Sequence, residues 1–436
     1  MTPIQEQSLP PILAGKDVIA QGKTGSGKTA AFGLGLLEKL EVKRFRVQSL
    51  VLCPTRELAD QVAKEIRRLA RTIHNIKVLT LCGGMPFGPQ IGSLEHGAHI
   101  IVGTPGRVQE HLRKGTLKLD HLNMLVLDEA DRMLDMGFQP TLDAIMEYTP
   151  DNRQTLLFSA TFPEQIQSIA DSIMTDPVMA RVISTHTNDS INQKFYKVDN
   201  NEQRLTALRL LLLQHQPEST VVFCNTKREA QEVADELGQH GFSALALHGD
   251  LEQKDRDQTL VRFSNKSASV LVATDVAARG LDIENLDAVI NYHLSRDPEV
   301  HVHRIGRTGR AGSSGLACTL HSDKESYKVA VLEEYLDLSI ENTPLPPQHI
   351  LNTPPFEPAM LTLQIDGGKK QKVRPGDILG ALTGDNGISG KQVGKIAVFD
   401  NWAYVAIERD AGKTALKKLT TGNLKGRSFR VRKITR

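Results

Sequence analysis

A glycine-rich loop near the N-terminus carries the residue types needed to bind a nucleoside triphosphate. The segment Gly22-Lys-Thr-Gly-Ser-Gly-Lys28-Thr29 follows a predicted strand and opens a predicted helix. Glycines such as Gly25 and Gly27 let backbone N–H groups approach phosphate oxygens, and the Lys28 ammonium can neutralise the β- and γ-phosphates. The Thr29 hydroxyl can coordinate Mg²⁺. The strand–loop–helix order favours nucleotide binding over a flexible turn.

Adjacent carboxylates follow another apolar run, in a place suited to activating water. The run Met124–Leu127 ends in Asp128-Glu129-Ala130-Asp131. If it is a strand of a parallel sheet, the carboxylates emerge at the edge where such sheets bind ligands. Asp128 could then hold Mg²⁺ through the coordination shell of the ion, while Glu129 orients and deprotonates the attacking water. An acidic tetrapeptide alone is more often a helix N-terminus, so this prediction depends on the upstream phosphate loop.

The elements that must position these groups alternate between strand and helix patterns, which favours an α/β fold with helices on both faces of a parallel sheet. A first series of short apolar runs is followed by the polar stretch Ser184–Asn192, and then a second series begins. We therefore expect tandem α/β domains with the polar stretch as a hinge. The runs are Asp17–Gln21, Ser49–Cys53, Ile76–Leu81, His99–Val102, Met124–Leu127 and Thr155–Phe158, then Ser219–Cys224, Ala244–His248, Ser269–Ala273, Ala288–Tyr292 and Gly315–Leu320.

Length and composition exclude several classes of protein. The 436 residues correspond to about three domains of ~100–200 residues each. Hydrophobic residues make up 40% and charged residues 24%, which is typical of a packed globular chain. The four cysteines lie far apart without a CxxC pair, so a disulfide scaffold or a cysteine-rich zinc site is disfavoured. Without a signal-like N-terminus or a long apolar run, we expect a soluble, cytoplasmic protein.

The C-terminal part differs from the rest in charge and in proline content. Between Ser339 and Ala359, six prolines predict a stiff, extended linker. Residues 360–436 contain 16 basic and 6 acidic residues, a balance of +10, whereas the remainder has a balance of −8. This asymmetry favours a polyanionic partner for the C-terminal part over a merely soluble surface.

Beyond the linker, the pattern predicts the order β-α-β-β-α-β of a ferredoxin-like domain, which RNA-recognition motifs share with many unrelated domains. The expected strands are Met360–Asp366, Gly394–Phe399, Trp402–Glu408 and Ser428–Ile434, and the expected helices are Gly376–Thr383 and Lys413–Thr420.

In order and spacing, the motifs of the first 335 residues resemble those of the DEAD-box RNA helicases. No single motif establishes this resemblance, but the order in which the motifs follow one another along the chain does. The matching segments are Thr2-Pro3-Ile4-Gln5, the phosphate loop, Pro54-Thr-Arg-Glu-Leu58, Gly83-Gly84, Thr104-Pro-Gly-Arg107, Asp128-Glu-Ala-Asp131, Ser159-Ala-Thr161, Val221-Val-Phe-Cys-Asn-Thr226, Gln253-Lys-Asp-Arg256, Ala273-Thr-Asp-Val-Ala-Ala-Arg-Gly-Leu-Asp282 and His303-Arg-Ile-Gly-Arg-Thr-Gly-Arg310.

The resemblance implies two RecA-like domains that close on ATP and single-stranded RNA. It implies that Gln5 reads the adenine edge, that Asp282 meets the ribose, and that Arg307 and Arg310 reach the γ-phosphate from the second domain. An arginine finger of this kind contributes about 10³–10⁵ in rate. Because the phosphate loop would lie on the other domain, hydrolysis would depend on closure.

The resemblance also implies residues that couple ATP to RNA and residues that contact RNA. Short polar side chains and guanidinium groups suit phosphate and sugar contacts, so sequence-independent gripping of the RNA backbone, with 2′-OH contacts, is expected in the core. For each of these arginines, an ordinary surface salt bridge is the alternative. The coupling residues are Asp131, Ser159, Thr161 and His303, and the RNA-contacting residues are Arg56, Gly83, Gly84, Thr104, Arg107, Asn225, Thr226, Arg256, Thr274 and Arg279.

The C-terminal part looks like the domain that one bacterial group of these helicases appends to its core. That group recognises a hairpin of large-subunit ribosomal RNA and acts in assembly of that subunit. The aromatic string on the central strands of a standard RNA-recognition motif is absent, leaving Trp402 and Tyr404 as the main ring candidates. Basic residues, Lys369 and Lys370 among them, favour a shaped basic surface over base stacking on a flat sheet.

Together these observations predict an ATP- and Mg²⁺-dependent RNA helicase that remodels structured RNA, with ribosomal RNA and ribosome assembly intermediates as partners. No membrane and no obligate protein partner are expected. An ATP-gated, non-catalytic RNA clamp and a DNA helicase of the same architecture remain open as alternatives. The expected domains are 1–183 (N-terminally short), 184–338, the linker 339–359 and the basic domain 360–436.

Overall fold

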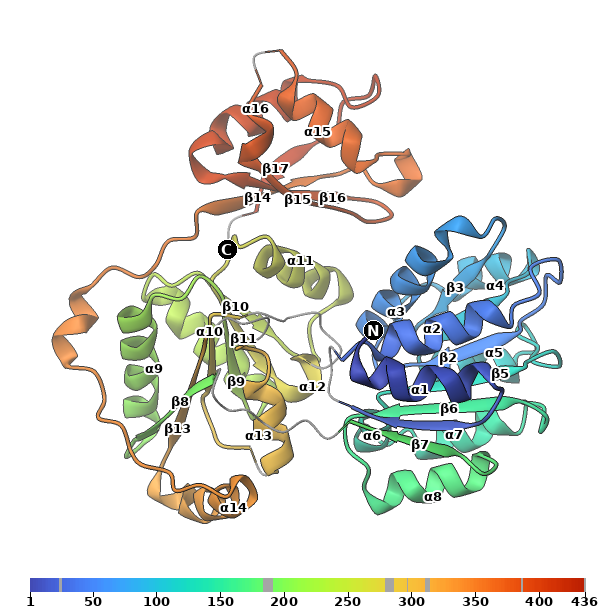
Figure 1. Ribbon diagram of the computed structural model, residues 1–436. Helices are drawn as coiled ribbons and strands as arrows, with labels where there is room; N and C mark the ends of the chain where they lie inside the picture. Colours follow the sequence, from blue (N-terminus) through green and yellow to red (C-terminus); the bar gives the residue numbers. More distant parts are fainter. Residues whose placement is uncertain are drawn as a thin grey trace. The chain divides into compact units, whose positions relative to one another are not determined.

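The structure is a computed structural model (Figure 1) that describes residues 1–22, 26–182, 191–278, 286–295, 297–309, 314–385 and 387–434. The chain divides into two compact units, the first formed by the described residues up to 182 and the second by those from 191 onward. Within these ranges, none of the helices combines the length and the apolar character that crossing a membrane requires.

The first unit is built on a parallel sheet with strand order β3-β4-β2-β5-β6-β1-β7. Its strands consist largely of buried apolar residues that alternate between two cores. On β5, for example, Met124 and Val126 pack into one core, while Leu125 and Leu127 pack into the other. The strands are β1 (Val18–Gln21), β2 (Ser49–Leu52), β3 (Val78–Leu81), β4 (Ile100–Gly103), β5 (Met124–Asp128), β6 (Gln154–Ser159) and β7 (Val178–Arg181).

Helices cover both faces of this sheet, as the sequence predicted (Figure 1). One core contains apolar residues of α1 (Pro3–Leu13), α2 (Lys28–Glu38) and α3 (Arg56–Leu69). The opposite core contains residues of the remaining helices of the unit, which are α4 (Phe87–Glu95), α5 (Pro105–Arg113), α6 (Ala130–Asp135), α7 (Gln139–Met146) and α8 (Glu164–Ile173).

The second unit contains another parallel sheet, with strand order β10-β11-β9-β12-β13-β8. The edge strand β8 begins at Ile191, inside the stretch that was expected to be a polar hinge, and the remainder of that stretch, 184–190, lies outside the described residues. The strands are β8 (Ile191–Lys197), β9 (Thr220–Cys224), β10 (Ala244–Leu247), β11 (Val270–Thr274), β12 (Ala288–Asn291) and β13 (Gly315–His321).

Two long helices of the second unit, α9 (Asn201–His215) and α10 (Lys227–Gln239), bury their apolar residues in one core with alternate residues of the strands. The other helices of this sheet's domain are α11 (Gln253–Ser264), α12 (Asp275–Ala278), α13 (Pro298–Ile305) and α14 (Ser326–Leu336). The tandem α/β organisation predicted from the sequence is therefore confirmed.

The proline-rich segment 339–359 is extended, apart from one short 3-10 helix, η4 (Gln348–Asn352). Leu345, Ile350 and Leu351 pack against the core that contains α9 and α10. The segment begins with a backbone hydrogen bond from the amide of Thr343 to the carbonyl of Phe195, of 2.7 Å. Over part of its length, the linker is thus attached to the surface of the second unit.

The C-terminal domain has the predicted β-α-β-β-α-β order and an antiparallel sheet with strand order β15-β16-β14-β17. Alternate strand residues, Leu361 and Leu363 for example, pack against apolar residues of the two helices. The elements are β14 (Met360–Ile365), α15 (Pro375–Thr383), β15 (Val393–Val398), β16 (Ala403–Glu408), α16 (Gly412–Thr421) and β17 (Val431–Lys433).

On the two central strands, β14 and β16, the second face of this small sheet is also buried. Thr362 on β14 and Tyr404 on β16 alternate with the core residues, yet they are 1% and 0% exposed. The side chains of Asn265 and Ser267, just after α11, bond the Thr362 hydroxyl at 3.2 and 2.7 Å. The Lys254 ammonium on α11 lies 5.6 Å from the centre of the Trp402 ring. This face therefore packs against α11, and Tyr404 is not available to stack on a base as the sequence had suggested.

Candidate nucleotide site and RNA interface

The predicted phosphate loop joins β1 to α2 at the carboxyl edge of the first sheet. Gly27 is the N-cap of α2 with φ +93°, and a Cβ there would overlap the amide of Gln5. Lys28 begins the helix, is 6% exposed, and donates a hydrogen bond of 2.8 Å to the carbonyl of Gly22. The site therefore combines the positive end of a helix with a buried ammonium group, which is the arrangement that binds phosphate. Gly25 lies outside the described residues.

Gln5 is fixed against the end of this loop. Its Nε2 donates to the carbonyl of Gly27 at 3.1 Å, and its Oε1 accepts from the amide of Thr2 at 3.0 Å. The side chain is thereby oriented by the hydrogen bond from the Thr2 amide at the start of α1 and held beside the start of α2. The structure thus brings Gln5, the expected adenine reader, to the phosphate loop.

The acidic motif begins at the carboxyl end of β5. Glu129 has φ +52°, an unusual conformation for a residue other than glycine, and its amide donates to Asp128 Oδ1 at 3.1 Å. Both side chains are buried. Burial raises the pKa of Asp128 to about 7, although the nearby charge of Lys28 acts to lower it. A strained turn and a perturbed carboxyl group are typical of functional sites.

The donors at this edge fit Mg²⁺. They are the carboxylate of Asp128, whose buried charge lacks full compensation, and the hydroxyl of Thr29 at the start of α2. Among the described residues, no cluster of three or more His, Cys, Asp or Glu side chains could enclose a metal. A magnesium ion here would therefore take most of its ligands from water and nucleotide phosphates, as Mg²⁺ usually does.

Hydrogen bonds connect the acidic motif to the segment after β6. Asp131 Oδ2 accepts from both the amide and the hydroxyl of Thr161, each at 3.1 Å. The hydroxyl of Ser159 donates to the carbonyl of Thr161 at 2.6 Å, and the Ser159 carbonyl accepts from the amide of Gly22. The structure thus brings three of the predicted coupling residues together with the start of the phosphate loop. The fourth, His303, lies on α13 of the second unit.

Several predicted RNA-contacting residues of the first unit lie at the other half of the same sheet edge, after β2, β3 and β4. Arg56 Nη1 donates to the carbonyl of Gly83 at 3.4 Å. Gly84 has φ +73°, and a Cβ there would overlap the Arg56 guanidinium. Thr104 is the N-cap of α5, but its hydroxyl makes no capping hydrogen bond. The nucleotide candidates follow β1, β5 and β6, so the two predicted sites occupy separate halves of one edge.

Arg107 belongs to a network that sequence reasoning missed. Its Nη1 donates to Gln90 Oε1 and to the carbonyl of Met85, both at 2.9 Å, and its guanidinium lies 5.4 Å from the centre of the Phe87 ring. His111 stacks on Phe87 with ring centres 4.1 Å apart and bonds Gln90 Oε1 at 3.0 Å. The sequence feature that could have indicated this network is the pair Phe87 and Gln90, three positions apart and shortly after Gly83-Gly84.

In the second unit, the predicted RNA-contacting threonines lie after β9 and at the end of β11. Thr226 is the N-cap of α10 and accepts from the amide of Glu229 at 3.2 Å. Thr274 ends β11, and its hydroxyl accepts from the amide of Ala277 at 3.4 Å. Arg256 is 9% exposed and donates to the carbonyl of Ala277 at 2.8 Å, so it also braces α12. Arg279 lies outside the described residues.

The predicted arginine fingers follow α13. The backbone of Arg307 is fixed on both sides, since its amide donates to the carbonyl of Arg304 and its carbonyl accepts from the amide of Leu286, each at 3.2 Å. The buried side chain of Arg304 instead pairs with the partly exposed Asp275, with both contacts at 2.7 Å. Arg310 and the predicted ribose ligand Asp282 lie outside the described residues.

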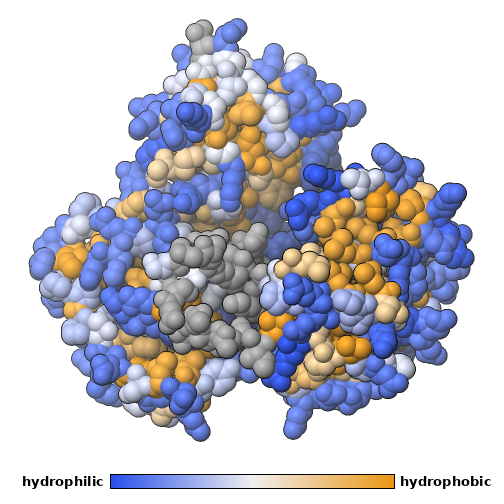
Figure 2. Space-filling model, viewed as in Figure 1, coloured by the Kyte–Doolittle hydropathy of each residue, from blue (hydrophilic) through white to orange (hydrophobic). Residues whose placement is uncertain are grey.

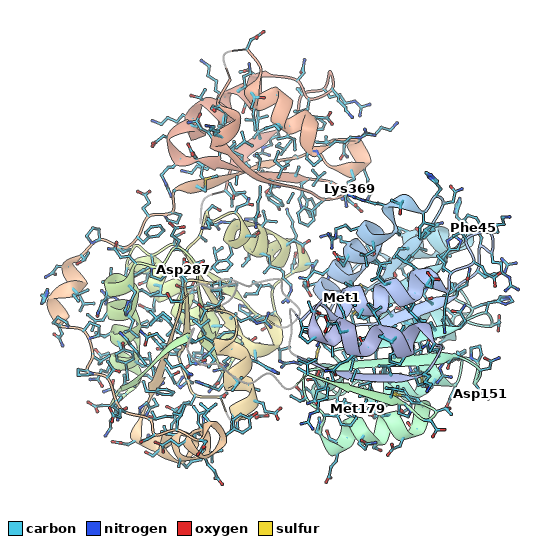
Figure 3. The ribbon with its side chains drawn as sticks, viewed as in Figure 1. Met1, Phe45, Asp151, Met179, Asp287 and Lys369 are labelled. Carbon is cyan, nitrogen blue, oxygen red and sulfur yellow. The ribbon has the colours of Figure 1, made fainter. Side chains whose placement is uncertain are left out.

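In the C-terminal domain, Lys369 and Lys370 form a short 3-10 turn after β14. Their amides donate to the carbonyls of Phe399 and Asp400 at 2.8 and 2.9 Å, while their side chains are exposed. Figure 3 labels Lys369 at the edge of this domain, and in Figure 2 hydrophilic residues line much of its outline. A rigid backbone thus presents two ammonium groups to solvent, as expected for a surface that binds phosphates.

Three family models match the chain in succession. Residues 2–169 match the DEAD/DEAH box helicase model, and residues 203–312 match the helicase conserved C-terminal domain. Residues 362–433 match the DbpA RNA binding domain. Together the matches cover most of both parallel sheets and of the small antiparallel domain, whereas the strands β7, β8 and β13 lie outside them.

Relatives of known class resemble the chain over nearly its full length. The ATP-dependent RNA helicase DbpA of Escherichia coli K12 is 56% identical over 99% of this chain and 94% of its own length. The protein of the same name from Bacillus subtilis is 37% identical over the same shares of the two chains. The structure of Saccharomyces cerevisiae Dbp5 bound to RNA and ADP BeF3 superposes with a TM-score of 0.71 and 32% identity, covering 79% of this chain and 90% of Dbp5. The chain therefore belongs to the DEAD-box family of ATP-dependent RNA helicases and, within it, to the DbpA type.

Proposed function

We propose that this RNA-dependent ATPase locally unwinds structured RNA, and that its target is a hairpin of large-subunit ribosomal RNA in ribosome assembly intermediates. The observation that carries the choice of target is the basic C-terminal domain, whose balance of +10 contrasts with −8 for the rest of the chain. Its match to the DbpA RNA binding domain supports the same choice. Such a role would place the protein in the cytoplasm.

In this proposal, the edge formed by β1, β5 and β6 binds and hydrolyses ATP. Lys28 and the amides at the start of α2 bind the phosphates, with Gln5 at the adenine. Thr29 and Asp128 hold Mg²⁺, which would neutralise developing charge on the phosphates. Glu129 orients and deprotonates the attacking water. Arg307 and Arg310 supply positive charge to the transition state, and Asp282 binds the ribose.

RNA binding is assigned to the residues that follow β2, β3 and β4 in the first unit and to residues at or after the ends of β9, β10 and β11 in the second, Arg256 on α11 among them. Their hydroxyl and guanidinium groups suit contacts to phosphate and ribose. The hydrogen bonds from Thr161 to Asp131 offer a physical connection between the hydrolytic edge and RNA binding. We assign Ser159 and His303 to the same coupling. ATP-driven closure would bend the bound strand and displace its partner.

We place the domain boundaries of this machine after residues 183, 338 and 359, so that the basic domain selects the RNA and the two-sheet core works on it. The segment 339–359 packs along the second unit, which keeps the basic domain near the core. A tethered RNA would be present at about millimolar effective concentration for the core.

Crosslinking the protein to RNA in cells, followed by sequencing of the bound fragments, tests the target. We expect one hairpin of large-subunit ribosomal RNA to dominate, and an even distribution over messenger RNA would contradict the proposal. In vitro, steady-state phosphate release should be stimulated more by that hairpin than by a scrambled RNA or by DNA of equal sequence. Absence of RNA-stimulated turnover, with tight binding retained, would favour the non-catalytic clamp.

A further inference from the structure

His293, just after β12, lies between the carboxylates of the partly buried Glu229 and the buried Glu325. Its Nε2 is 2.6 Å from Glu229 Oε1, and its Nδ1 is 3.5 Å from Glu325 Oε1. The side chain is 16% exposed. Because each ring nitrogen faces an oxygen that can only accept, both contacts are satisfied at once only when both nitrogens carry a proton.

One carboxylate holds the turn between β9 and α10. Glu229 Oε2 accepts from the amide of Asn225 at 3.2 Å, and the amide of Glu229 donates to the Thr226 hydroxyl at 3.2 Å. Glu229 therefore fixes the turn Asn225–Thr226 from within the first turn of the helix. The bond from His293 restrains the Glu229 oxygen that the turn does not use.

The other carboxylate is an anchored point. Glu325 Oε2 is 2.7 Å from Nη2 of the buried Arg204, and it accepts from the amide of Ser322 at 3.0 Å. The Lys328 ammonium lies 3.7 Å from Glu325 Oε1. Burial acts to raise the pKa of Glu325, but the bonds from His293 and Arg204 hold it well below its usual range. His293 thus connects Glu325, which is held in place by Arg204 and Ser322, to Glu229, which holds the turn.

The backbone of His293 supports a different part of the predicted RNA interface. Its carbonyl accepts from Arg304 Nη1 at 2.9 Å, and Arg304 is paired with both oxygens of Asp275, which directly follows Thr274. The side chain of His293 therefore acts toward Thr226, whereas its carbonyl acts toward Thr274. Substituting the side chain removes only the first connection.

We propose that His293 is a positioning residue for RNA binding, because its charged ring holds Glu229 against Glu325 and so fixes the turn Asn225–Thr226. The inference rests on the proposed RNA contact at Thr226. When the ring is neutral, one of its nitrogens faces a carboxylate without a proton, and the turn loses part of its restraint.

The surroundings of the ring determine how this restraint depends on pH. Burial acts to lower the pKa of His293, but the hydrogen bonds to Glu229 and Glu325 outweigh it and raise the pKa above its ordinary value, against the nearby charge of Arg204. Lys328, which faces Glu325, is the other nearby cation. Since the folded-state pKa is raised, the stabilisation is present at lower pH and is lost as the pH rises through that pKa. Affinity for RNA should fall in the same direction.

The test compares H293L and H293Q with the full-length parent chain. The leucine variant should raise the KM for RNA by about tenfold, the effect expected for a lost charged hydrogen bond, with kcat at saturating RNA nearly unchanged. The parent should bind RNA more weakly as the pH rises from about 6 to about 9, whereas both variants should show a flatter profile. The glutamine variant should recover part of the affinity, because its amide can still donate to Glu229.

A double-mutant comparison separates positioning from general damage to the fold. The double variant H293L/T226A should raise the KM for RNA by less than the product of the two single fold-changes, because both substitutions act on the same turn. The double variant H293L/T274A should raise it by the full product of the single fold-changes. An unchanged KM in H293L, a parent-like pH profile in H293Q, or independent effects of H293L and T226A would each overturn the proposal. If T226A alone left RNA affinity unchanged, the RNA contact at Thr226 itself would be wrong. Should the leucine variant unfold, the pH profile of H293Q decides.

Discussion

Thr161 binds a single oxygen of Asp131 twice, through its backbone amide and through its hydroxyl, at 3.1 Å in each case. This pair links the end of β6 to the acidic motif, two residues beyond the proposed base Glu129. A movement of either segment must therefore be accommodated by the other or break these bonds.

Replacing Thr161 with valine should separate hydrolysis from strand separation. Valine keeps the shape and the amide bond but removes the hydroxyl bond to Asp131. We expect unwinding per ATP hydrolysed to fall severalfold, with little change in the KM for ATP. Duplex separation and phosphate release should be measured on the same preparation. T149V, which removes a local hydroxyl bond at the end of α7, is the matched control. Parent-like unwinding per ATP in T161V would contradict the coupling role.

Replacing Glu129 with glutamine should abolish most turnover. The amide retains the size of the side chain but cannot accept the proton of the attacking water, a loss of about 10²–10⁴-fold for a general base. Binding of ATP and RNA should be retained, as measured by fluorescence titration. E147Q, at the exposed end of α7, makes the same chemical change away from the site. Near-normal phosphate release by E129Q would refute the assignment.

Replacing Arg307 with alanine should reduce turnover far more than nucleotide affinity. A transition-state contact of this type contributes about 10³–10⁵ in rate, whereas ground-state binding does not require it. Single-turnover hydrolysis and ATP titration distinguish the two quantities. R307K keeps the charge without the planar fork and should recover only part of the rate. Equal losses in rate and affinity would indicate ground-state binding instead.

Acid should weaken the first unit through His111. Burial, followed by the charge of Arg107, lowers the pKa of His111 to about 4. The folded state disfavours the charged ring, so the neutral ring contributes to the free energy of unfolding. This contribution is complete above the ordinary pKa of about 6.5 and is lost as the pH falls toward 4. The loss is at most about 3 kcal/mol. The thermal stability of the parent should therefore approach that of H111Q between about pH 7.5 and 5. A constant difference between the two proteins would contradict this.

Reversing the charges of Lys369 and Lys370 should remove RNA selection while sparing hydrolysis. K369E/K370E should lose most of its preference for the ribosomal hairpin over a scrambled RNA, and its affinity should depend less steeply on salt because fewer counterions are released. ATPase activity at saturating unstructured RNA should persist. K413E/K417E makes the same charge change on exposed positions of α16. If both double variants lost hairpin preference equally, general charge rather than this turn would be responsible.

Most of the fold could be predicted because its strands are short, buried apolar runs separated by helical patterns. The strand β7 (Val178–Arg181) was missed since it is a half-exposed edge strand without a continuous apolar run. The edge strand β8 was missed because polar residues interrupt Ile191–Lys197. In both cases the strand is specified by pairing with a neighbour far away in sequence, β1 and β13 respectively.

The candidate site was predictable where a residue type suited to phosphate or metal binding lies at or shortly after the end of a predicted strand, as Asp128 and Lys28 do. It was not predictable where contacts join distant segments, as in the bonds that Gln90 makes to His111 and Arg107. The alternation of apolar and polar residues along β16 also did not predict that Tyr404 is buried. An alternating strand shows which residues face its own helices, but it does not show that α11 covers the other face.

The packing of α11 on the small sheet limits how this helicase could be re-engineered. A chimera that grafts residues 360–436 onto another core would carry Thr362 and Tyr404 into solvent, and it would leave Asn265 and Ser267 of the donor behind. Because α11 also carries Arg256, any redesign of this helix for a new appended domain must keep that residue, which is assigned to RNA binding. The transferable module of this protein is therefore the small domain together with α11 and the turn after it.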